Sequence, residues 1–377
     1  VRAFTGAGYG QYSEVVSASS DEVNPVPKVM LSSQEYIKIL DLDSASSICV
    51  DWVSRSVYYT QVEAESHVTY RASLVVTTAR PQVSRVFTRA KPVHSLQIAP
   101  LHETLFWYEE SKHPGLGSIM ISNLNGSHVK SFFNNSDRTD CNCPENPQVA
   151  KTFVIDMTKG DNYELYWVDP WIHKLMATDM YGCQCRTVFD ATEKKKFGFT
   201  PMSLTVDSKY VYWFNSTGKD IYYTNKYKNA KVEHAKTTHG YKIMALDPGN
   251  QKYPPRQCLF PNVQKLRPKA VSNSADSITL EMPAVEKPNQ CRDLKYEMSV
   301  PEYTVFYRID MRNDTSVCDK ESCPYVTSTN TEVVLTDLKP FTNYTVMLEA
   351  TNYYAKLHDI KPIVGTSLVV LTAAEGK

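Results

Sequence analysis

The sequence has little glycine, no long apolar run and no excess of either charge. Its 377 residues include 14 Gly, and Lys plus Arg balance Asp plus Glu at 41 each. A membrane-spanning helix needs about 20 consecutive apolar residues, and no stretch of that kind occurs. The balanced charge gives no electrostatic attraction to nucleic acid or to an anionic membrane. We therefore expect no membrane insertion and no nucleic-acid partner.

Motifs of catalysis and cofactor binding are missing as well. Gly6, Gly8 and Gly10 lack the spacing of a nucleotide-binding loop, and no helical pattern follows them. The nine His residues form no H-E-x-x-H motif, and no serine lies in a G-x-S-x-G turn. We therefore expect a non-catalytic chain with no catalytic residue, no cofactor and no metal ligand.

The abundant residues predict a β-rich chain of two or three domains. Tyr occurs 24 times, and Val, Ile, Thr and Tyr dominate the apolar stretches, which favours strands over helices. A chain of 377 residues is too long for one ordinary core. Because the sequence lacks a starting Met and an apolar leader, we expect the natural protein to begin upstream, with any signal or anchor outside these residues.

Nine cysteines and five N-x-S/T triplets indicate a secreted or lumenal chain. Two C-x-C doublets, Cys141/Cys143 and Cys183/Cys185, are spaced more tightly than the C-x₂₋₄-C of most structural zinc sites. Disulfides are therefore favoured over zinc. The candidate N-glycosylation sites are Asn125, Asn134, Asn215, Asn313 and Asn343.

One unit recurs along residues 47–225. It consists of an apolar strand that ends near Asp, a turn, an aromatic strand, a second turn and a third strand. Aromatic pairs recur within it at about the period of a four-stranded propeller blade. A blade cannot bury its own faces, so such units must pack against each other around a ring. The motif residues are Asp51, Tyr58, Tyr59, Trp107, Asp156, Tyr166, Trp167, Asp169, Asp207, Tyr212 and Trp213.

These units resemble the YWTD β-propeller family, in which an aromatic inner strand ends in Thr-Asp. The Tyr-Trp-Val-Asp run at 166–169 is the best match, and half units at 28–42 and 241–248 open and end the region, which we place at 25–260. The resemblance implies six blades, whereas five units are visible. The connection at 43–46 is too short for the outer strand that should follow there, so we expect a segment to be absent from this sequence.

The repeat also suggests how the cysteines pair. Both doublets fall in turns after aromatic strands of adjacent units, so they can meet on one rim, whereas a bridge within C-x-C would be strained. We expect one doublet to bond to the other, with the individual partners left open. Further candidate pairs are Cys318 with Cys323 and Cys258 with Cys291, which leaves Cys49 as a thiol.

Residues 261–377 follow a different pattern, with short alternating strands between polar turns. The Leu-x-x-Leu-x-Pro-x-Thr-x-Tyr run at 335–344 resembles the fibronectin type III sandwich and places Tyr344 at its tyrosine corner. Met282 stands where that family usually has a core Trp. Residues 1–24 resemble the last strands of a second such module. The predicted fold class is all-β, with a YWTD-type propeller between fibronectin type III modules.

This module order, without EGF-like modules, resembles the Ros/Sevenless receptor tyrosine kinases. Local runs at 1–5, 51–55 and 182–185 are similar to the membrane-nearer propeller of the vertebrate members. The resemblance implies an extracellular segment of a single-pass type I receptor at the plasma membrane, which binds a protein ligand or relays its binding. The kinase domain, with its ATP and Mg, would lie elsewhere. The alternative is an adhesion or endocytic receptor that has the same modules and no kinase.

The link between propeller and second module predicts a fixed angle between them. Residues 259–268 include Pro261 and Pro268 and contain no Gly or Ser run, so they lack the composition of a flexible linker. Proline fixes φ and reduces the freedom of the chain. We expect one rigid unit, with the alternative that these prolines only mark a domain boundary.

Overall fold

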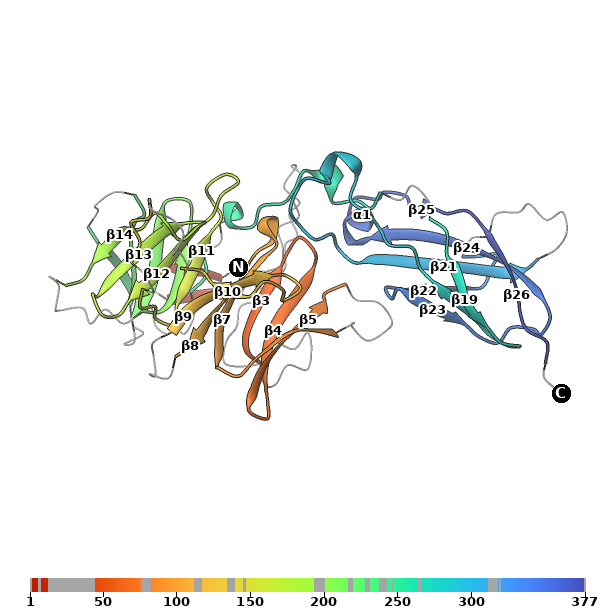
Figure 1. The fold of residues 1–377 in the computed structure, drawn as a ribbon. Helices are drawn as coiled ribbons and strands as arrows, with labels where there is room; N and C mark the ends of the chain where they lie inside the picture. Colours follow the sequence, from red (N-terminus) through yellow and green to blue (C-terminus); the bar gives the residue numbers. More distant parts are fainter. Residues whose placement is uncertain are drawn as a thin grey trace.

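The chain is all-β in the computed structural model, apart from one short helix and four 3₁₀ turns in the residues described (Figure 1). Apart from a two-stranded hairpin near the N-terminus, the sheets of the described residues fall into two parts, an array of four sheets and a two-sheet sandwich (Figure 1). The structure describes residues 2–5, 8–12, 45–75, 83–111, 117–133, 140–144, 147–192, 201–215, 220–227, 231–236, 243–245, 247–262, 266–310, 318 and 320–375.

The first part, which we call the sheet array, consists of four antiparallel sheets of four strands. Within each sheet the strands follow one another in chain order. Sheet 1 contains β3 (Ala45–Asp51), β4 (Ser56–Glu63), β5 (Ser66–Ser73) and β6 (Val83–Arg89). Sheet 2 contains β7 (Val93–Ala99), β8 (Thr104–Glu110), β9 (Gly117–Asn123) and β10 (Lys130–Ser131). Sheet 3 contains β11 (Phe153–Asp156), β12 (Glu164–Asp169), β13 (Lys174–Asp179) and β14 (Arg186–Asp190). Sheet 4 contains β15 (Pro201–Val206), β16 (Tyr210–Asn215), β17 (Asp220–Asn225) and β18 (Glu233–Lys236).

Aromatic rings fill the space between consecutive sheets. The first strands lie side by side, β3 next to β7, β7 next to β11 and β11 next to β15. Because successive strand residues point to opposite faces, one ring of the aromatic pair in sheets 2 and 3 packs on the preceding sheet and its neighbour on the following sheet. The ring pairs across the boundaries are Trp107 with Phe87 at 4.5 Å between centroids, Trp167 with Phe133 at 5.0 Å and Trp213 with Phe189 at 5.6 Å.

An aspartate ends or directly follows the first strand of three sheets and holds the turn that comes next. Asp51 Oδ1 accepts hydrogen bonds from the backbone N–H of Val53 and Ser54, at 2.9 and 3.0 Å. Asp156 and Asp207 accept N–H groups of their own turns in the same way. Asp is favoured in such turns because its short side chain binds the backbone two residues on. The Asp of the repeat is therefore a turn-forming residue.

A buried ion pair joins sheets 3 and 4. Lys226 directly follows β17, and its Nζ lies 2.5 Å from Oδ2 of Asp156, with both side chains fully buried. Thr158 Oγ1 donates to Asp156 Oδ1 at 2.7 Å and accepts from Lys226 Nζ at 3.1 Å. Arg186 Nη1 donates to the backbone oxygen of Lys226 at 2.6 Å. The positive charge of Lys226 is thus satisfied by groups of the neighbouring sheet.

The second part is a sandwich of two antiparallel sheets around its own core. Met282 is buried in this core, where the resemblance placed an atypical residue. One sheet has the order β19 (Lys269–Asn273), β20 (Ile278–Glu281), β23 (Glu332–Leu335). The other has the order β22 (Tyr325–Ser328), β21 (Pro301–Ile309), β24 (Asn343–Asn352), β25 (Ile363–Val364), with β26 (Leu368–Leu371) also paired to β24.

Gly365 allows a close approach at one end of the sandwich. A Cβ at this position would lie 2.0 Å from the backbone oxygen of Leu266, which is impossible without movement of the backbone. The same oxygen accepts the N–H of Thr366 at 3.0 Å. Only glycine therefore lets residues 365 and 366 pack on the chain that enters the sandwich.

The helix and the 3₁₀ turns lie in connections between strands. The helix α1 (Tyr353–Leu357) directly follows β24. The turns are η1 (Pro100–His102), η2 (Pro248–Asn250), η3 (Arg256–Cys258) and η4 (Asn289–Cys291).

The predicted ends of the propeller region have different outcomes. The hairpin of β1 (Arg2–Thr5) and β2 (Gly8–Tyr12) is formed, while the half unit at 28–42 and the short connection at 43–44 lie outside the described residues. At the other end, the N–H groups of Ile243 and Ala245 donate to the hydroxyls of Ser203 and Thr205, both at 3.0 Å. Ile243 and Ala245 of the second half unit therefore lie beside β15.

Candidate functional site: the junction between sheet array and sandwich

Residues 247–262, which we call the crossing segment, tie the turns of three sheets together before the chain enters the sandwich. Asn250 donates from Nδ2 to the backbone oxygen of Val206 at 2.6 Å and accepts at Oδ1 the N–H of Met157 at 3.3 Å. Lys252 then donates from Nζ to the backbone oxygen of Gly160 at 2.6 Å. Its own backbone oxygen accepts the indole N–H of Trp52 in sheet 1 at 2.8 Å. Sheets 4, 3 and 1 are thus linked in that order.

The helix α1 of the sandwich docks into the first turn of sheet 1. Asn352 caps this helix by accepting the N–H of Ala355 at 2.9 Å, and its Nδ2 donates to the backbone oxygen of Leu259 at 2.8 Å. Tyr354 is fully buried, and its hydroxyl lies 2.7 Å from the backbone oxygen of Trp52 and 2.9 Å from that of Val53. Burial raises the pKa of the Tyr354 phenol far above its ordinary value. The hydroxyl therefore remains a hydrogen-bond donor across the physiological range.

A single buried apolar cluster spans the junction. It includes residues of sheets 1 and 2, of the crossing segment and of the sandwich, so neither part buries it alone. Members from the sandwich side are fully or almost fully buried. The cluster contains Trp52, Val53, Tyr58, Phe87, Val93, Leu96, Ile98, Leu105, Trp107, Leu124, Cys258, Leu259, Cys291, Tyr296 and Tyr354.

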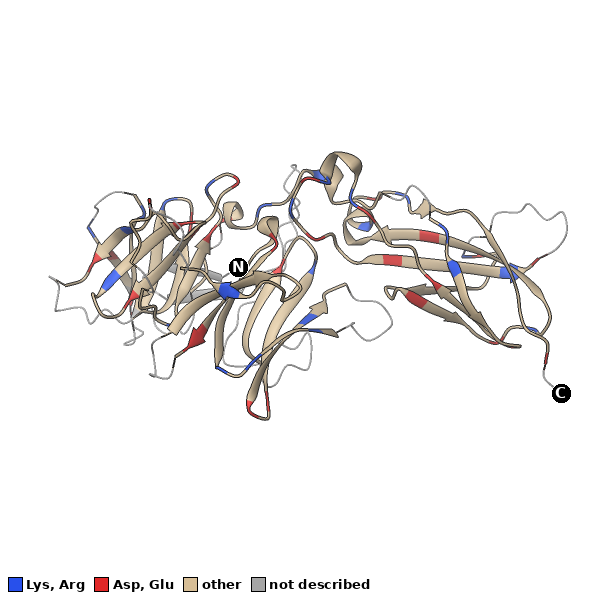
Figure 2. Ribbon diagram, in the orientation of Figure 1, with Lys and Arg blue, Asp and Glu red and all other residues tan. Residues whose placement is uncertain are grey.

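Charged side chains across the junction are complementary. Arg71 of β5 lies 2.5 Å from Glu297 of the sandwich, and Glu103 of sheet 2 lies 3.6 Å from Lys287. Lys and Arg are interspersed with Asp and Glu along both parts of the chain (Figure 2). The pairing uses both signs on each side, so it favours one orientation of the two parts over others.

Asp51 directly precedes Trp52 and Val53, the two residues whose backbone oxygens accept the Tyr354 hydroxyl. Its carboxylate is fully buried, and burial raises the pKa of Asp51 from 3.8 to about 6, against the hydrogen bonds from Ser54 and the nearby Arg71, which lower it. A carboxyl whose folded pKa is raised binds its proton more tightly in the folded chain than in the unfolded chain. Stability from this group is therefore present below about pH 4 and is lost as the pH rises to about 6.

The variant Asp51→Asn should remove that pH dependence. The amide oxygen can accept the two N–H groups, and the amide nitrogen can donate to Ser54 Oγ, so the turn is preserved. Between pH 4 and pH 7 we expect the unfolding free energy of the variant to rise relative to wild type by up to about 3 kcal/mol, from a shift of about two pKa units. Denaturant unfolding at the two pH values measures this difference. A constant difference would contradict the assignment to Asp51.

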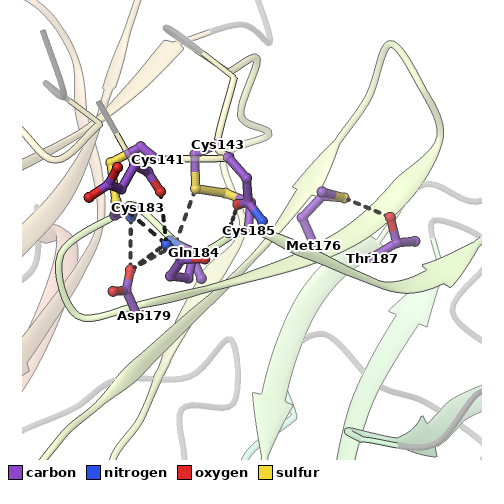
Figure 3. The surroundings of a disulfide bond; sticks show 11 residues. Cys141, Cys143, Met176, Asp179, Cys183, Gln184, Cys185 and Thr187 are labelled. Atoms are coloured by element: carbon purple, nitrogen blue, oxygen red, sulfur yellow. Dashed lines mark hydrogen bonds between the residues drawn. A yellow bond between two sulfur atoms is a disulfide. The ribbon is translucent and has the colours of Figure 1, made fainter. Parts of the chain in front are cut away.

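Two neighbouring disulfides bring the predicted C-x-C doublets together (Figure 3). They connect residues 140–144 with the turn that follows β13. Asp179 holds this turn by accepting two of its backbone N–H groups, at 2.8 and 3.0 Å. The structure also assigns the partners that the sequence left open. The bonds are Cys141–Cys183 and Cys143–Cys185, with Cα atoms 4.6 and 4.8 Å apart.

The other cysteines lie in the crossing segment and the sandwich, except for one in sheet 1. Cys258 is bonded to Cys291, and Cys318 to Cys323. The first bond pins η3 to η4, next to Tyr296, whose hydroxyl donates to the backbone oxygen of Cys258 at 2.7 Å. Cys49, in β3, keeps its thiol.

The predicted glycosylation sites are dispersed. Asn125 is exposed in the turn after β9, and Asn343 is exposed at the start of β24. Asn215 is the last residue of β16. Asn134 and Asn313 lie outside the described residues. Glycans at these positions stay a prediction.

The predicted motif residues are structural. Nine of the eleven are buried, whereas Asp207 and Tyr212 are half-buried. Asp169 Oδ1 accepts the N–H of Trp171 at 3.0 Å and so holds the turn between β12 and β13. At the tyrosine corner, the Tyr344 hydroxyl accepts the N–H of Lys339 at 2.8 Å.

Sequence reasoning missed the residues that form the junction. Asn250, Lys252, Asn352 and Tyr354 belong to no repeat and to no familiar motif. The local signal for the last two is a helical run, Asn-Tyr-Tyr-Ala-Lys-Leu at 352–357, between two strands. A short helix with two adjacent tyrosines, placed between two strands, indicates a surface that packs on another part of the protein.

Neither a metal centre nor a membrane-spanning helix is found among the residues that the structure describes. The described residues contain no group of three or more His, Cys, Asp or Glu arranged to hold a metal ion. Across those same ranges, no helix is both long and apolar enough to cross a lipid bilayer.

Comparisons with known proteins show that the chain is similar to part of a tyrosine-protein kinase. Residues 258–373 match the family model of the ROS1 fibronectin type III domain. The proto-oncogene tyrosine-protein kinase ROS of Homo sapiens is 22% identical over 94% of this chain, and that of Gallus gallus is 23% identical over 96%. The chain spans about 18% of the length of these curated relatives. Among solved structures, one from a nidogen/laminin complex has 16% identity and a TM-score of 0.40, covering 67% of this chain and 82% of that one.

These similarities confirm the predicted resemblance to the Ros receptor tyrosine kinases. The residues of the sandwich fall within the match to the ROS1 fibronectin type III domain. The match covers about 18% of the length of these kinases, so the similarity concerns one segment of them and not the whole protein.

Proposed function

We propose that this chain is a non-catalytic segment of the extracellular part of a single-pass receptor tyrosine kinase at the plasma membrane, and that it binds an extracellular protein or relays such binding along the receptor. The observation that carries the proposal is the similarity to the ROS kinases over 94% of the chain. The ATP and Mg of the kinase reaction would belong to a domain outside these residues. The whole chain would face the exterior of the cell.

In this proposal the sheet array is most of a YWTD-type β-propeller at residues 25–260. Residues 1–24 would end one fibronectin type III module, and residues 261–377 would form the next. The repeated sheets, with first strands side by side and rings between them, are what a propeller requires. Sheet 1 also carries an apolar face of its own, with Val57, Tyr59 and Ala72 buried beside Tyr70. A further blade packed on this face would complete the arrangement.

The junction supports a role in relaying a signal. Hydrogen bonds, an apolar cluster and complementary ion pairs hold the sandwich against the sheet array, and a disulfide bonds the sandwich to the crossing segment. An element that only tethers a ligand-binding domain needs no fixed angle, whereas an element that transmits a rearrangement does. The predicted stiff link at 259–268 is therefore one part of a larger contact.

Sequencing the complete transcript that encodes this chain tests the receptor-kinase proposal. We expect an apolar helix of about 20 residues downstream, followed by a Gly-rich loop and the H-R-D and D-F-G motifs of a kinase. A transcript with the same ectodomain modules and a cytoplasmic tail without these motifs would instead establish the adhesion or endocytic receptor. Either result leaves the observed contacts of the junction unchanged.

A further inference from the structure

Tyr354 packs in the apolar cluster of the junction rather than in the core of the sandwich that carries it. Along β24, Tyr344, Val346, Leu348 and Ala350 pack in the sandwich core. Four residues after Ala350, the ring of Tyr354 packs in the cluster formed with sheets 1 and 2. The chain therefore leaves one core and enters the other within four residues, where β24 ends and α1 begins. The helix α1 inserts this ring into the sheet array.

The turn that receives Tyr354 is held from two sides. From within sheet 1, Asp51 binds the N–H groups of Val53 and Ser54. From the sandwich, the Tyr354 hydroxyl binds the backbone oxygens of Trp52 and Val53. These carbonyl groups are buried in the junction, so loss of the hydroxyl would leave them without this donor in a place with little access to water.

Two further contacts involve the rings of Tyr354 and of its neighbour Tyr353. The guanidinium of Arg55, in the same turn, lies 4.4 Å from the ring centroid of Tyr353, next to Tyr354 in the helix. The ring of Tyr253, from the crossing segment, meets the Tyr354 ring edge-on at 6.1 Å between centroids. The turn, the crossing segment and the helix therefore meet around one side chain.

From this geometry we propose that Tyr354 is a latch residue, whose hydroxyl couples the sandwich to the sheet array so that residues 51–56 and 352–360 open and close together. The latch would be the physical element of the relay, and for that biological meaning the proposal rests on the proposed function. Because the two segments are about 300 residues apart in sequence, such coupling can arise only through the junction.

The variant Tyr354→Phe in the full chain tests the latch. It keeps the buried ring and removes only the hydroxyl. Hydrogen–deuterium exchange should become about tenfold faster both in residues 51–56 and in residues 352–360, because one buried hydrogen bond changes an opening equilibrium by about that factor. Peptides from β8 and β21 should keep their wild-type rates. Unchanged exchange in residues 51–56 would overturn the proposal.

The matched control is Tyr344→Phe in the same module. It removes the hydroxyl of another buried tyrosine, which is also bound to the backbone, but within the sandwich. Exchange should rise near residues 339–346 and stay at the wild-type rate in residues 51–56. If this control accelerated residues 51–56 as much as Tyr354→Phe does, general loosening of the sandwich would explain both results, and the latch would be rejected.

A second variant weakens the junction from the side of the sheet array, at the contact between Arg55 and Tyr353. Arg55→Met removes the cation over Tyr353 while keeping an unbranched side chain. A cation–π contact of this kind changes an equilibrium by about two- to fivefold, so exchange in residues 51–56 and 352–360 should rise together by about that factor. A rise in the first segment alone would contradict the coupling. None of these outcomes depends on whether a kinase is encoded downstream.

Discussion

Replacing Lys226 by Met should lower the free energy of unfolding by about 3–5 kcal/mol. Lys226 and Asp156 are both fully buried, so the variant leaves an ionised carboxylate of sheet 3 without its counter-charge. Removing one partner of a buried pair is costly because the remaining charge keeps its desolvation penalty. Denaturant unfolding of the two proteins at pH 7 measures the loss.

The double variant Lys226→Met with Asp156→Leu tests whether the loss of stability comes from the unpaired charge. It removes both charges, so it should recover most of the stability lost by Lys226→Met, because apolar residues often replace a buried pair at little cost. Lys174→Met is the matched surface control. Its partner is Asp190, in the neighbouring strand, and both side chains are partly exposed. We expect a loss of about 1 kcal/mol or less. An equal loss for both single variants would show that burial of the pair is unimportant.

Removing the Cys258–Cys291 bond by changing both residues to Ala should cost about 4 kcal/mol. The bond closes a loop with a sequence separation of 33 residues. Opening such a loop raises the conformational entropy of the unfolded chain, which lowers the free energy of unfolding by about 4 kcal/mol. Both cysteines are also part of the buried junction cluster, so the change affects the packing of sandwich and sheet array together. Thermal unfolding without reductant measures the loss.

The control for this prediction is the Cys318–Cys323 bond, which has a sequence separation of only 5 residues. The same loop-entropy relation gives about 2 kcal/mol for its removal. We therefore expect the double variant at 258 and 291 to be the less stable of the two. The reverse order would mean that the junction gains little from its disulfide.

The sheets of the array could be predicted from the sequence because their signals are local. An apolar strand that ends at Asp51 or Asp156, followed by an aromatic pair, is readable within about 15 residues and recurs along the chain. The proposed pairing of Cys141/Cys143 with Cys183/Cys185 came from the position of each doublet within its unit. The all-β class followed from the same strand patterns.

The junction could not be predicted because its contacts join residues that are far apart in sequence. Tyr354 binds residues of sheet 1 about 300 positions away, and nothing in the run at 352–357 identifies that partner. Lys226 looks like an ordinary surface lysine after a strand, yet it is fully buried against Asp156, 70 residues earlier. The prolines of the link indicated a stiff connection, but not which side chains form it.

The crossing segment has a consequence for the order of events during synthesis. Trp52 emerges from the ribosome 200 residues before Lys252, which accepts its indole N–H, and 302 residues before Tyr354. At about 5–20 residues per second, the first turn of sheet 1 waits about 15–60 seconds for its last partner. During that interval the apolar surface around Trp52 and Val53 is available to chaperones and to neighbouring nascent chains. The slowest step in maturation should therefore be the docking of the sandwich, and premature termination within it should leave a sheet array that is prone to aggregate.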